Sequence, residues 1–308
     1  MDFKSTLAYV FANVLSFLLR CSLVYQKRNI RRLVAALNQK KFQLEHRIEE
    51  KRIRFSYLIL LLIIILPVLL ATLYTILSLH EVAELFTYGF EVTTESGQIF
   101  VCFFGSYTYY VVFIEYPCII ALSMCLIINR CGILLHQFNL NLKSMKLYDF
   151  PIKITALLKD YDLIFDTVRL LKTTLSTPLF FIFLSSFLHL YLTMYNILRE
   201  YVEPYYMVEL IANTCTGLSI LISLTLLSSR ISEQLHEIRM TSQKLTNLIS
   251  QHNLRTFCGK RTLFLLERIE ARHVIHLSAC GMFDLKRSFL LSAFGFLFTY
   301  GLLVVNLY

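Results

Sequence analysis

The sequence lacks most of the patterns by which enzymes and disulfide-rich domains are recognised. It has eight cysteines but no two of them are separated by two residues, so neither a zinc-binding spacing nor a disulfide framework is visible. No Asn-x-Ser/Thr acceptor for glycosylation occurs. No nucleophile–base pair, phosphate-binding loop or pair of carboxylates stands out either. The sequence therefore predicts a protein that is not an enzyme and needs no cofactor.

Long apolar runs are what the chain has in abundance. Hydrophobic residues make up 56% of its 308 residues, and the mean hydropathy is +0.59. A bilayer core of about 30 Å needs about 20 mostly apolar residues in a helix. Six stretches meet this need, of which the first is the least apolar: 5–25, 57–79, 99–128, 178–199, 207–229 and 289–308. We predict an all-α, multi-span helical membrane protein with three spans in 1–128, two in 178–229 and one in 289–308.

Basic residues are absent from every second loop between these stretches. Loops 80–98 and 200–206 have no Lys or Arg, whereas loops 26–56, 129–177 and 230–288 hold 27 of the 30. Cytoplasmic loops accumulate Lys and Arg, so these three loops are expected in the cytoplasm, and both chain ends outside the cell. This orientation excludes a G-protein-coupled receptor, and the placement of the basic residues argues against nucleic acid as a partner. A secondary transporter remains a weaker alternative, because no internal repeat is visible.

The cytoplasmic stretches carry amphipathic helical patterns. Residues 152–175 place apolar side chains at helical spacing, and Pro178 is expected where the next span begins. The fifth span is expected to continue unbroken through the apolar stripe 231–249, and 262–280 is predicted as a further helix after Gly259. These helices either lie on the membrane surface or pack together. We favour a packed intracellular bundle within 129–177 and 230–288 that joins subunits, since an apolar stripe must be buried.

Tyrosines gather in the outer part of the third span, in the segment SYTYYVVFIEYP, 106–117. An aromatic pocket with one polar anchor is the usual composition of a small-molecule site. Tyrosines also collect at membrane interfaces, and a carboxyl in a span also serves as a structural hydrogen-bonding group, so this alternative stays open. The ligand-binding candidates are Tyr107, Tyr109, Tyr110 and Glu115, with Tyr74, Tyr191, Tyr195 and Asn213 as outer partners.

Three residues of metal-ligating types, two histidines and a cysteine, lie near the end of the last cytoplasmic stretch. If 262–280 is helical, His273, His276 and Cys280 share one helix face. No fourth ligand is evident, so we interpret them as packing residues and predict no metal.

The C-terminal segment 271–308 resembles the signature of the insect gustatory receptor family. That family ends its last helix with Thr-Tyr, five hydrophobic residues and Gln-Phe; here Thr299 and Tyr300 match, and 301–305 supply the five. The preceding FDLKRSFLLS, 283–292, is also similar to the family's approach to this helix. Asn306 and Leu307 stand where the family has Gln and Phe. The family has seven spans, so by this resemblance one span is missing at the N-terminus.

The resemblance implies a chemosensory ligand-gated cation channel of the plasma membrane. Such a channel is a homo- or heterotetramer whose last helices line a central pore, and small chemical ligands such as tastants bind among the other spans from the outside. The cytoplasmic helices join the subunits. Carried over by position, Asn306 and Leu307 become gate residues, with Thr299 and Tyr300 two turns below. Four amides offer a polar ring to a hydrated ion, and Leu307 can gate by dewetting.

Two other interpretations remain at this stage. Asn306 alone is also an ordinary polar residue at a membrane interface, where water is available. The shortened chain is also compatible with a non-conducting auxiliary subunit of such a channel. The sequence names neither the ligand nor the composition of the assembly.

Overall fold

Long helices form this structure, a computed structural model that describes residues 3–39, 46–78, 94–145, 150–197, 204–252 and 257–307. Four described helical stretches are long and apolar enough to cross a membrane, and the apolar part of α9 is shorter. This confirms the predicted all-α, multi-span fold. The elements are α1 (Phe3–Gln39), α2 (His46–Ser78), α4 (Glu95–Tyr110), the π-helical turn η1 (Val111–Glu115), α5 (Tyr116–Ser144), α6 (Phe150–Ile197), α7 (Pro204–His252), α8 (Phe257–Glu270), β1 (Ser278–Ala279), β2 (Phe283–Asp284) and α9 (Arg287–Leu307).

The predicted spans fall within helices wherever the chain is described. The first, 5–25, lies in α1, which is not among the four membrane-crossing stretches, and the others lie in α2, α4 with α5, α6, α7 and α9. Positions 79, 198–199 and 308 lie outside the described residues. The predicted unbroken continuation of the fifth span is confirmed, because α7 is one helix of 49 residues. At 1.5 Å per residue it is about 74 Å long, far more than a bilayer core requires.

The helix that contains Pro178 does not begin there. We predicted a helix start at Pro178, and this is wrong, because α6 runs through it from Phe150 to Ile197. A proline inside a helix forfeits one backbone hydrogen bond and crowds the preceding turn. Packing compensates here, because Leu175 and Leu179 on either side of the proline are buried in the hydrophobic core of the bundle.

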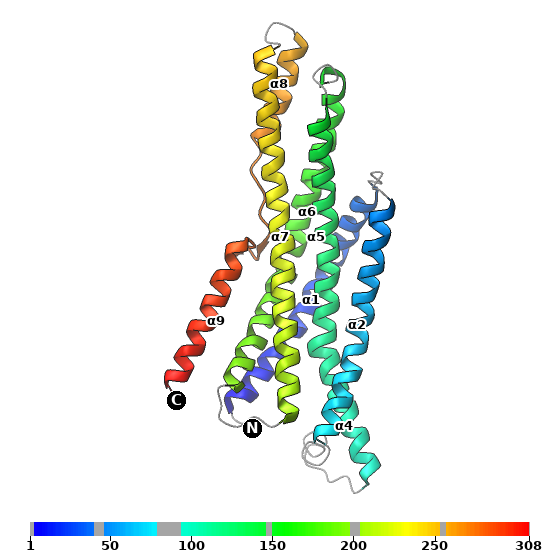
Figure 1. Ribbon diagram of the computed structural model, residues 1–308, viewed down its shortest axis with the longest axis vertical. Helices are drawn as coiled ribbons and strands as arrows, with labels where there is room; N and C mark the ends of the chain where they lie inside the picture. Colours follow the sequence, from blue (N-terminus) through cyan, green and yellow to red (C-terminus); the bar gives the residue numbers. More distant parts are fainter. Residues whose placement is uncertain are drawn as a thin grey trace.

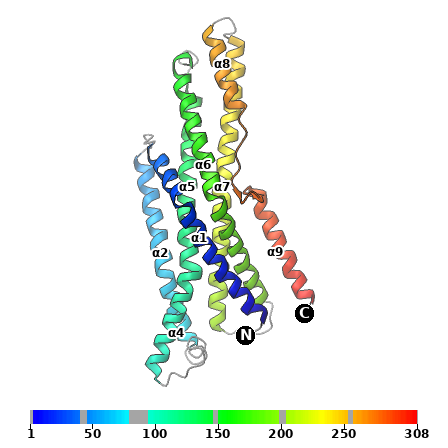
Figure 2. The same ribbon diagram turned by 180° about the vertical axis from the view of Figure 1, so that it is seen from behind.

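The helices α5, α6 and α7 form the centre of the bundle, and α1 crosses α6 diagonally (Figures 1 and 2). One hydrophobic core runs along these helices into α8. The apolar stripe predicted for 152–175 is buried in it at Ile154, Tyr161, Val168 and Leu175. The stripe is therefore covered by other helices rather than by lipid.

The far ends of α5, α7 and α8 are also joined by polar contacts. Asn139 on α5 donates to Glu237 on α7 at 3.0 Å and accepts from Thr241 at 3.0 Å. Between α7 and α8, the Thr246 hydroxyl donates to Glu270 at 2.7 Å. These contacts support the packed arrangement over helices lying separately on a membrane surface.

The helix predicted for 262–280 ends early. It is helical only to Glu270, and the chain then runs extended into the β1–β2 hairpin, where Ser278 pairs with Asp284. The turn has positive φ at Cys280 (50°) and Gly281 (72°), and Met282 N–H donates to Ala279 O at 3.0 Å, as in a type I′ turn. Cys280 N–H donates to Ser176 O at 3.2 Å, which ties the hairpin to α6.

Because α8 ends at Glu270, the two histidines and the cysteine predicted to share a helix face do not lie on one helix. His273 and His276 lie in the extended segment, and Cys280 lies in the turn. Within the described part of the chain, no group of three His, Cys, Asp or Glu side chains is placed to hold a metal ion.

Candidate functional site

A buried polar cluster joins α4 to α7 in the part of the bundle that the loop charges place outside. The Tyr109 hydroxyl donates to Glu209 Oε1 at 2.5 Å. Glu209 is only 7% exposed, and Asn213, one turn further along α7, is equally buried and also approaches the Tyr109 hydroxyl. A carboxylate at this depth needs such donors, because an unpaired buried charge is costly.

Aromatic rings extend this cluster across four elements. The Tyr109 ring lies 4.7 Å from that of Phe113 and 5.4 Å from that of Tyr110, measured between centroids. Tyr110 meets Tyr74 of α2 edge-on at 6.3 Å, and Phe113 meets His189 of α6 edge-on at 5.9 Å. The edge-to-face geometry is the one that aromatic quadrupoles favour. One continuous set of rings therefore connects α2, α4, η1 and α6.

The π-helical turn η1 sets the directions of these side chains. Tyr116 N–H donates to Val111 O, five residues back, and Pro117 follows without an N–H of its own. A π-turn adds one residue to the helix and so rotates the following side chains relative to those before it. As a result Tyr110, Phe113 and Ile114 are all buried, whereas Glu115 remains partly exposed.

Three buried polar atoms near these rings have unused hydrogen-bonding capacity. Tyr110 Oη, His189 Nε2 and Thr193 Oγ1 find no hydrogen-bond partner among the described residues. His189 and Thr193 are four residues apart on α6, so they lie on the same helix face. Buried polar atoms are normally paired, so these atoms are where a bound polar group or water gains most.

The structure unites half of the ligand-binding candidates. Tyr74, Tyr109, Tyr110 and Asn213 belong to the cluster, and Tyr107 stacks on Phe103 beside it, with centroids 6.2 Å apart.

The remaining candidates lie outside these contacts. Glu115 is not the carboxylate that meets Tyr109, and neither the exposed Tyr191 nor the half-buried Tyr195 takes part in the contacts described above. The sequence reasoning missed Glu209, Phe113 and His189. The signal for Glu209 and His189 was present, since each is an isolated ionisable residue in an otherwise apolar run.

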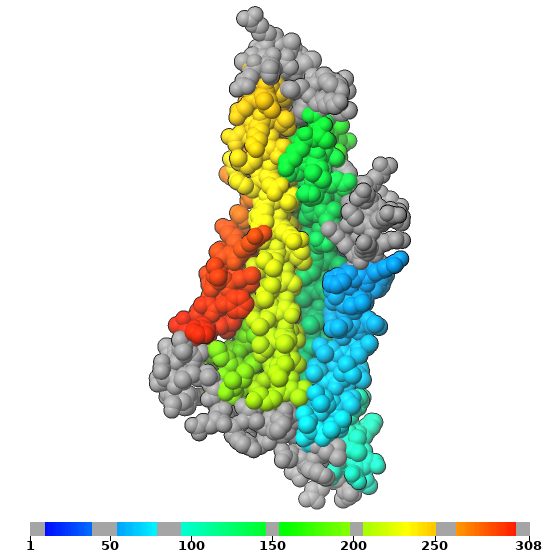
Figure 3. Space-filling view, in the orientation of Figure 1, coloured from blue at the N-terminus to red at the C-terminus, as the bar shows by residue number. Residues whose placement is uncertain are grey.

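The final helix, α9, is held to the bundle mainly at its beginning. Arg287 pairs with Glu233 of α7 through two contacts, Nε–Oε1 at 2.9 Å and Nη2–Oε2 at 3.0 Å. Phe289 stacks on Phe283 of the hairpin at 4.7 Å and meets Phe183 of α6 edge-on at 5.6 Å. Beyond this base, α9 slants away from α7 (Figures 1 and 3).

Most of the described side chains of α9, those of 287–299, are exposed although the sequence is apolar. Leu291 is 78% exposed and Phe298 is 70% exposed, whereas Ala293 is buried. Large apolar surfaces on one helix indicate a membrane-facing or subunit-facing role.

One face of α9 carries small and polar residues instead. Ser288, Ser292, Gly295 and Thr299 follow at intervals of four, three and four, and all four are exposed. Thr299 Oγ1 donates to Gly295 O at 2.8 Å and Ser292 Oγ to Ser288 O at 3.3 Å, which leaves the hydroxyl oxygens able to accept from water. Position 306 falls on the same face, because 18 residues after Ser288 make about five turns. We call these five positions the polar stripe.

The four gate candidates all lie on α9. The side chain of Thr299 is described and exposed; for Tyr300, Asn306 and Leu307 the structure describes only the helical backbone. The assignment of these residues to a gate therefore stays a prediction.

Comparison with known proteins gives a consistent picture. No curated protein sequence matches the chain significantly. The insect olfactory receptor OR5 from Machilis hrabei in complex with eugenol has a similar fold, with a TM-score of 0.68 at 14% identity over 96% of this chain and 79% of that one. OR5 without a named ligand gives 0.68 at 13% identity, over 98% and 80%. The family model described as 7tm Chemosensory receptor matches residues 5–306. This match confirms the family inferred from the segment 271–308 and the prediction that the chain is not an enzyme; the chain belongs to the 7tm chemosensory receptor family.

Proposed function

We propose that this chain is a subunit of a chemosensory, ligand-gated, non-selective cation channel of the plasma membrane, with its C-terminus outside the cell. The observation that carries the proposal is the polar stripe on an otherwise apolar and exposed helix. In a single subunit surrounded by lipid, the hydroxyl groups of this face would find no water to bind. Around a symmetry axis, copies of α9 place the stripe toward a water-filled path and the apolar faces toward protein and lipid. The tetramer, from like or related chains, follows from the family resemblance.

The gate lies at the outward end of this helix. Asn306 belongs to the polar stripe by register, and the neighbouring Leu307 narrows the path with an apolar group that favours dewetting. Thr299 and Tyr300 lie about two turns below and support the approach to it.

The ligand site is the cluster around Tyr109 and Glu209. The proposed contacts are Tyr74, Tyr109, Tyr110 and Asn213, with Tyr107 beside them, and the structure adds Glu209 and His189. The other candidates, Glu115, Tyr191 and Tyr195, lie outside these contacts and stay predictions. A small aromatic ligand with one hydroxyl suits these surroundings, because Tyr110 Oη and His189 Nε2 have unused hydrogen-bonding capacity among rings. That an OR5 structure holds the small odorant eugenol supports a ligand of this kind.

Cysteine substitution on α9 tests the pore. In cells that express Ser292→Cys or Thr299→Cys, current evoked by a ligand panel beginning with eugenol is measured before and after a cationic, membrane-impermeant methanethiosulfonate reagent. Leu291→Cys is the matched control, because Leu291 is highly exposed but lies off the polar stripe. The parent chain, treated in parallel, controls for its exposed Cys21, Cys215 and Cys280.

We expect the reagent to block current in the two stripe variants and to leave Leu291→Cys and the parent chain unchanged. Equal effects on stripe and control variants contradict the assignment of this face to the pore. Current that appears only with a co-expressed relative of the same family, and is insensitive to the stripe variants, identifies the chain as an auxiliary subunit instead. An antibody to a C-terminal epitope that binds only permeabilised cells overturns the orientation.

A further inference from the structure

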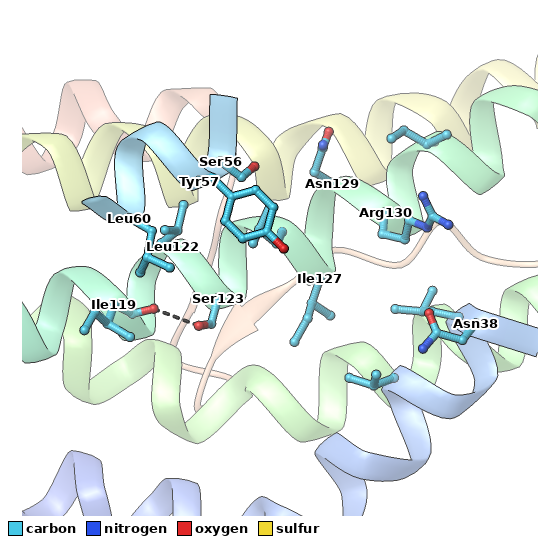
Figure 4. A pocket seen from close by; sticks show the side chains of 14 residues that line it. Asn38, Ser56, Tyr57, Leu60, Ile119, Leu122, Ser123, Ile127, Asn129 and Arg130 are labelled. Atoms are coloured by element: carbon cyan, nitrogen blue, oxygen red, sulfur yellow. Dashed lines mark hydrogen bonds between the residues drawn. The ribbon is translucent and has the colours of Figure 1, made fainter. Parts of the chain in front are cut away.

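A second candidate site lies on the cytoplasmic side of the Tyr109 cluster, in a groove between α1, α2 and α5. The groove has a volume of about 520 Å³, within the range of ligand sites. Figure 4 shows Arg130 and Asn38 at one end of it and Leu60, Leu122 and Ile119 at the other. The polar end lies where α1 ends and α2 begins, which the loop charges place on the cytoplasmic side. The groove is thus polar toward the cytoplasm and apolar toward the membrane interior.

The part of the groove between Ile119 and Arg130 is about as long as one leaflet of a bilayer is thick. Ile119 and Arg130 are eleven residues apart on α5, which corresponds to about 16 Å of helix. Half of a hydrocarbon core of about 30 Å is about 15 Å. When the Arg130 guanidinium lies at the level of the lipid headgroups, Ile119 therefore lies near the bilayer midplane.

A second, wholly apolar hollow of about 390 Å³ lies against the first. It is lined by side chains of α2 and shares Tyr57 and Leu60 with the groove. Tyr57, Leu58 and Leu61 around it are strongly exposed, so this hollow opens outward from the bundle. Two adjoining apolar hollows below one polar end suit a molecule with two hydrocarbon chains and one headgroup.

The positive charge of arginine side chains at the polar end of the groove favours an anionic lipid headgroup. Arg130 is half-buried in the groove, and Arg54 is exposed about one turn before Tyr57 on α2. A guanidinium binds phosphate through two parallel hydrogen bonds and is less strongly hydrated than an ammonium group. We infer that the groove binds an anionic phospholipid of the cytoplasmic leaflet, with its phosphate on Arg130 and an acyl chain between α1, α2 and α5.

Such a lipid fills the space between α2 and α5 and holds α1 against both. Its headgroup end lies on the cytoplasmic side, away from the Tyr109 cluster, and none of the residues that line the groove belongs to the proposed ligand site. A failure to detect lipid binding therefore does not bear on the proposed channel function, and lipid binding and channel function can be tested separately.

Photolabelling tests the inference with the full chain in phosphatidylcholine nanodiscs. The discs contain a trace of photoreactive phosphatidylserine or, in parallel, of photoreactive phosphatidylcholine, and labelled peptides are identified by mass spectrometry. The variants are Arg130→Gln, Arg130→Lys and Leu122→Trp. Arg230→Gln is the matched control, because Arg230 is an exposed arginine of α7 that does not line the groove. Gel-filtration elution confirms that each variant is folded before labelling.

We expect phosphatidylserine to label peptides of α1, α2 and α5 about fivefold more than phosphatidylcholine, the ratio set by one guanidinium near an anionic lipid. Arg130→Gln removes this preference, Arg130→Lys keeps most of it, Arg230→Gln leaves it intact, and Leu122→Trp lowers labelling by both lipids. Equal labelling of the wild-type groove by both lipids overturns the inference. So does an equal loss in Arg130→Gln and Arg230→Gln, or labelling confined to other helices.

Discussion

Replacing Tyr109 with phenylalanine removes one hydroxyl from the interior of the bundle and leaves its ring contacts in place. Interhelical hydrogen bonds in membrane proteins contribute about 0.6 kcal/mol on average. A charged acceptor roughly doubles such a bond, and Glu209 is buried, so the loss of its donor adds a desolvation cost. We expect Tyr109→Phe to lower the free energy of unfolding by about 1.5 kcal/mol. At about 2 °C per kcal/mol for a chain of this size, Tm falls by about 3 °C.

A double-mutant cycle with Glu209→Leu isolates the pair. Replacing both partners by apolar groups is less costly than keeping a buried carboxylate without the Tyr109 donor, so Tyr109→Phe/Glu209→Leu is expected to be at least as stable as Tyr109→Phe alone. Thermal unfolding of purified protein in detergent, followed by intrinsic tyrosine fluorescence, gives the four values. Tyr107→Phe is the control, since its ring stacks on Phe103 outside this bond. If the changes in the free energy of unfolding of the two single variants add up to that of the double variant within about 0.5 kcal/mol, Tyr109 and Glu209 are not coupled and the prediction is wrong.

Three further predictions concern positions away from this pair. Gly217→Ala places a Cβ 3.1 Å from Leu190 Cγ and is expected to destabilise the α6–α7 contact by about 1–2 kcal/mol. In Gly132→Ala the new Cβ meets nothing within 4 Å, and this change is expected to stabilise α5 by up to about 1 kcal/mol. Chemical or thermal unfolding shows whether the free energy of unfolding falls in the first variant and rises in the second. Gly281→Ala retains space for its Cβ but not an easy backbone, because φ is +72°, so a loss of about 1 kcal/mol is expected in the same assay. Burial lowers the pKa of His276, so the stability that its neutral form contributes is complete above the ordinary histidine pKa of about 6.5 and is lost as pH falls below that value. We therefore expect His276→Asn to flatten the decline of Tm between about pH 7.5 and pH 5.5. If the decline is the same in the variant, His276 is not its source.

The sequence was sufficient for most of the helical segments, because these depend on local patterns. The stripe of 152–175 and the unbroken run from the fifth span into 231–249 are periodic over many turns, and the structure has both as helices. The early end of α8 was not predictable in this way. Residues 271–280 keep some apolar spacing, but the segment is extended because the hairpin turn and its bond to Ser176 satisfy its backbone. Pro178 misled for a related reason, since packing over the whole bundle outweighs a local preference.

The candidate site was predictable only in part. The tyrosines of 106–117 indicate an aromatic region, and Tyr109 and Tyr110 do lie at its centre. The carboxylate that contacts these tyrosines is determined by the rotation that η1 introduces and by the position of α7. Neither of these is a local property of the sequence. The polar stripe of α9 was readable as a spacing of four, three and four, yet its significance required the exposure of those residues to be known.

The length of α7 has a mechanical consequence. Glu209, in the polar cluster, and Glu233, which holds Arg287 at the base of α9, are 24 residues apart on one uninterrupted helix, or about 36 Å. No loop, proline or glycine hinge other than Gly217 lies between them. A tilt or axial rotation of α7 that begins at Glu209 therefore arrives at α9 as a displacement of its anchor rather than as a sequence of side-chain rearrangements. The displacement at Glu233 therefore depends on the point along α7 about which the helix pivots within the bundle.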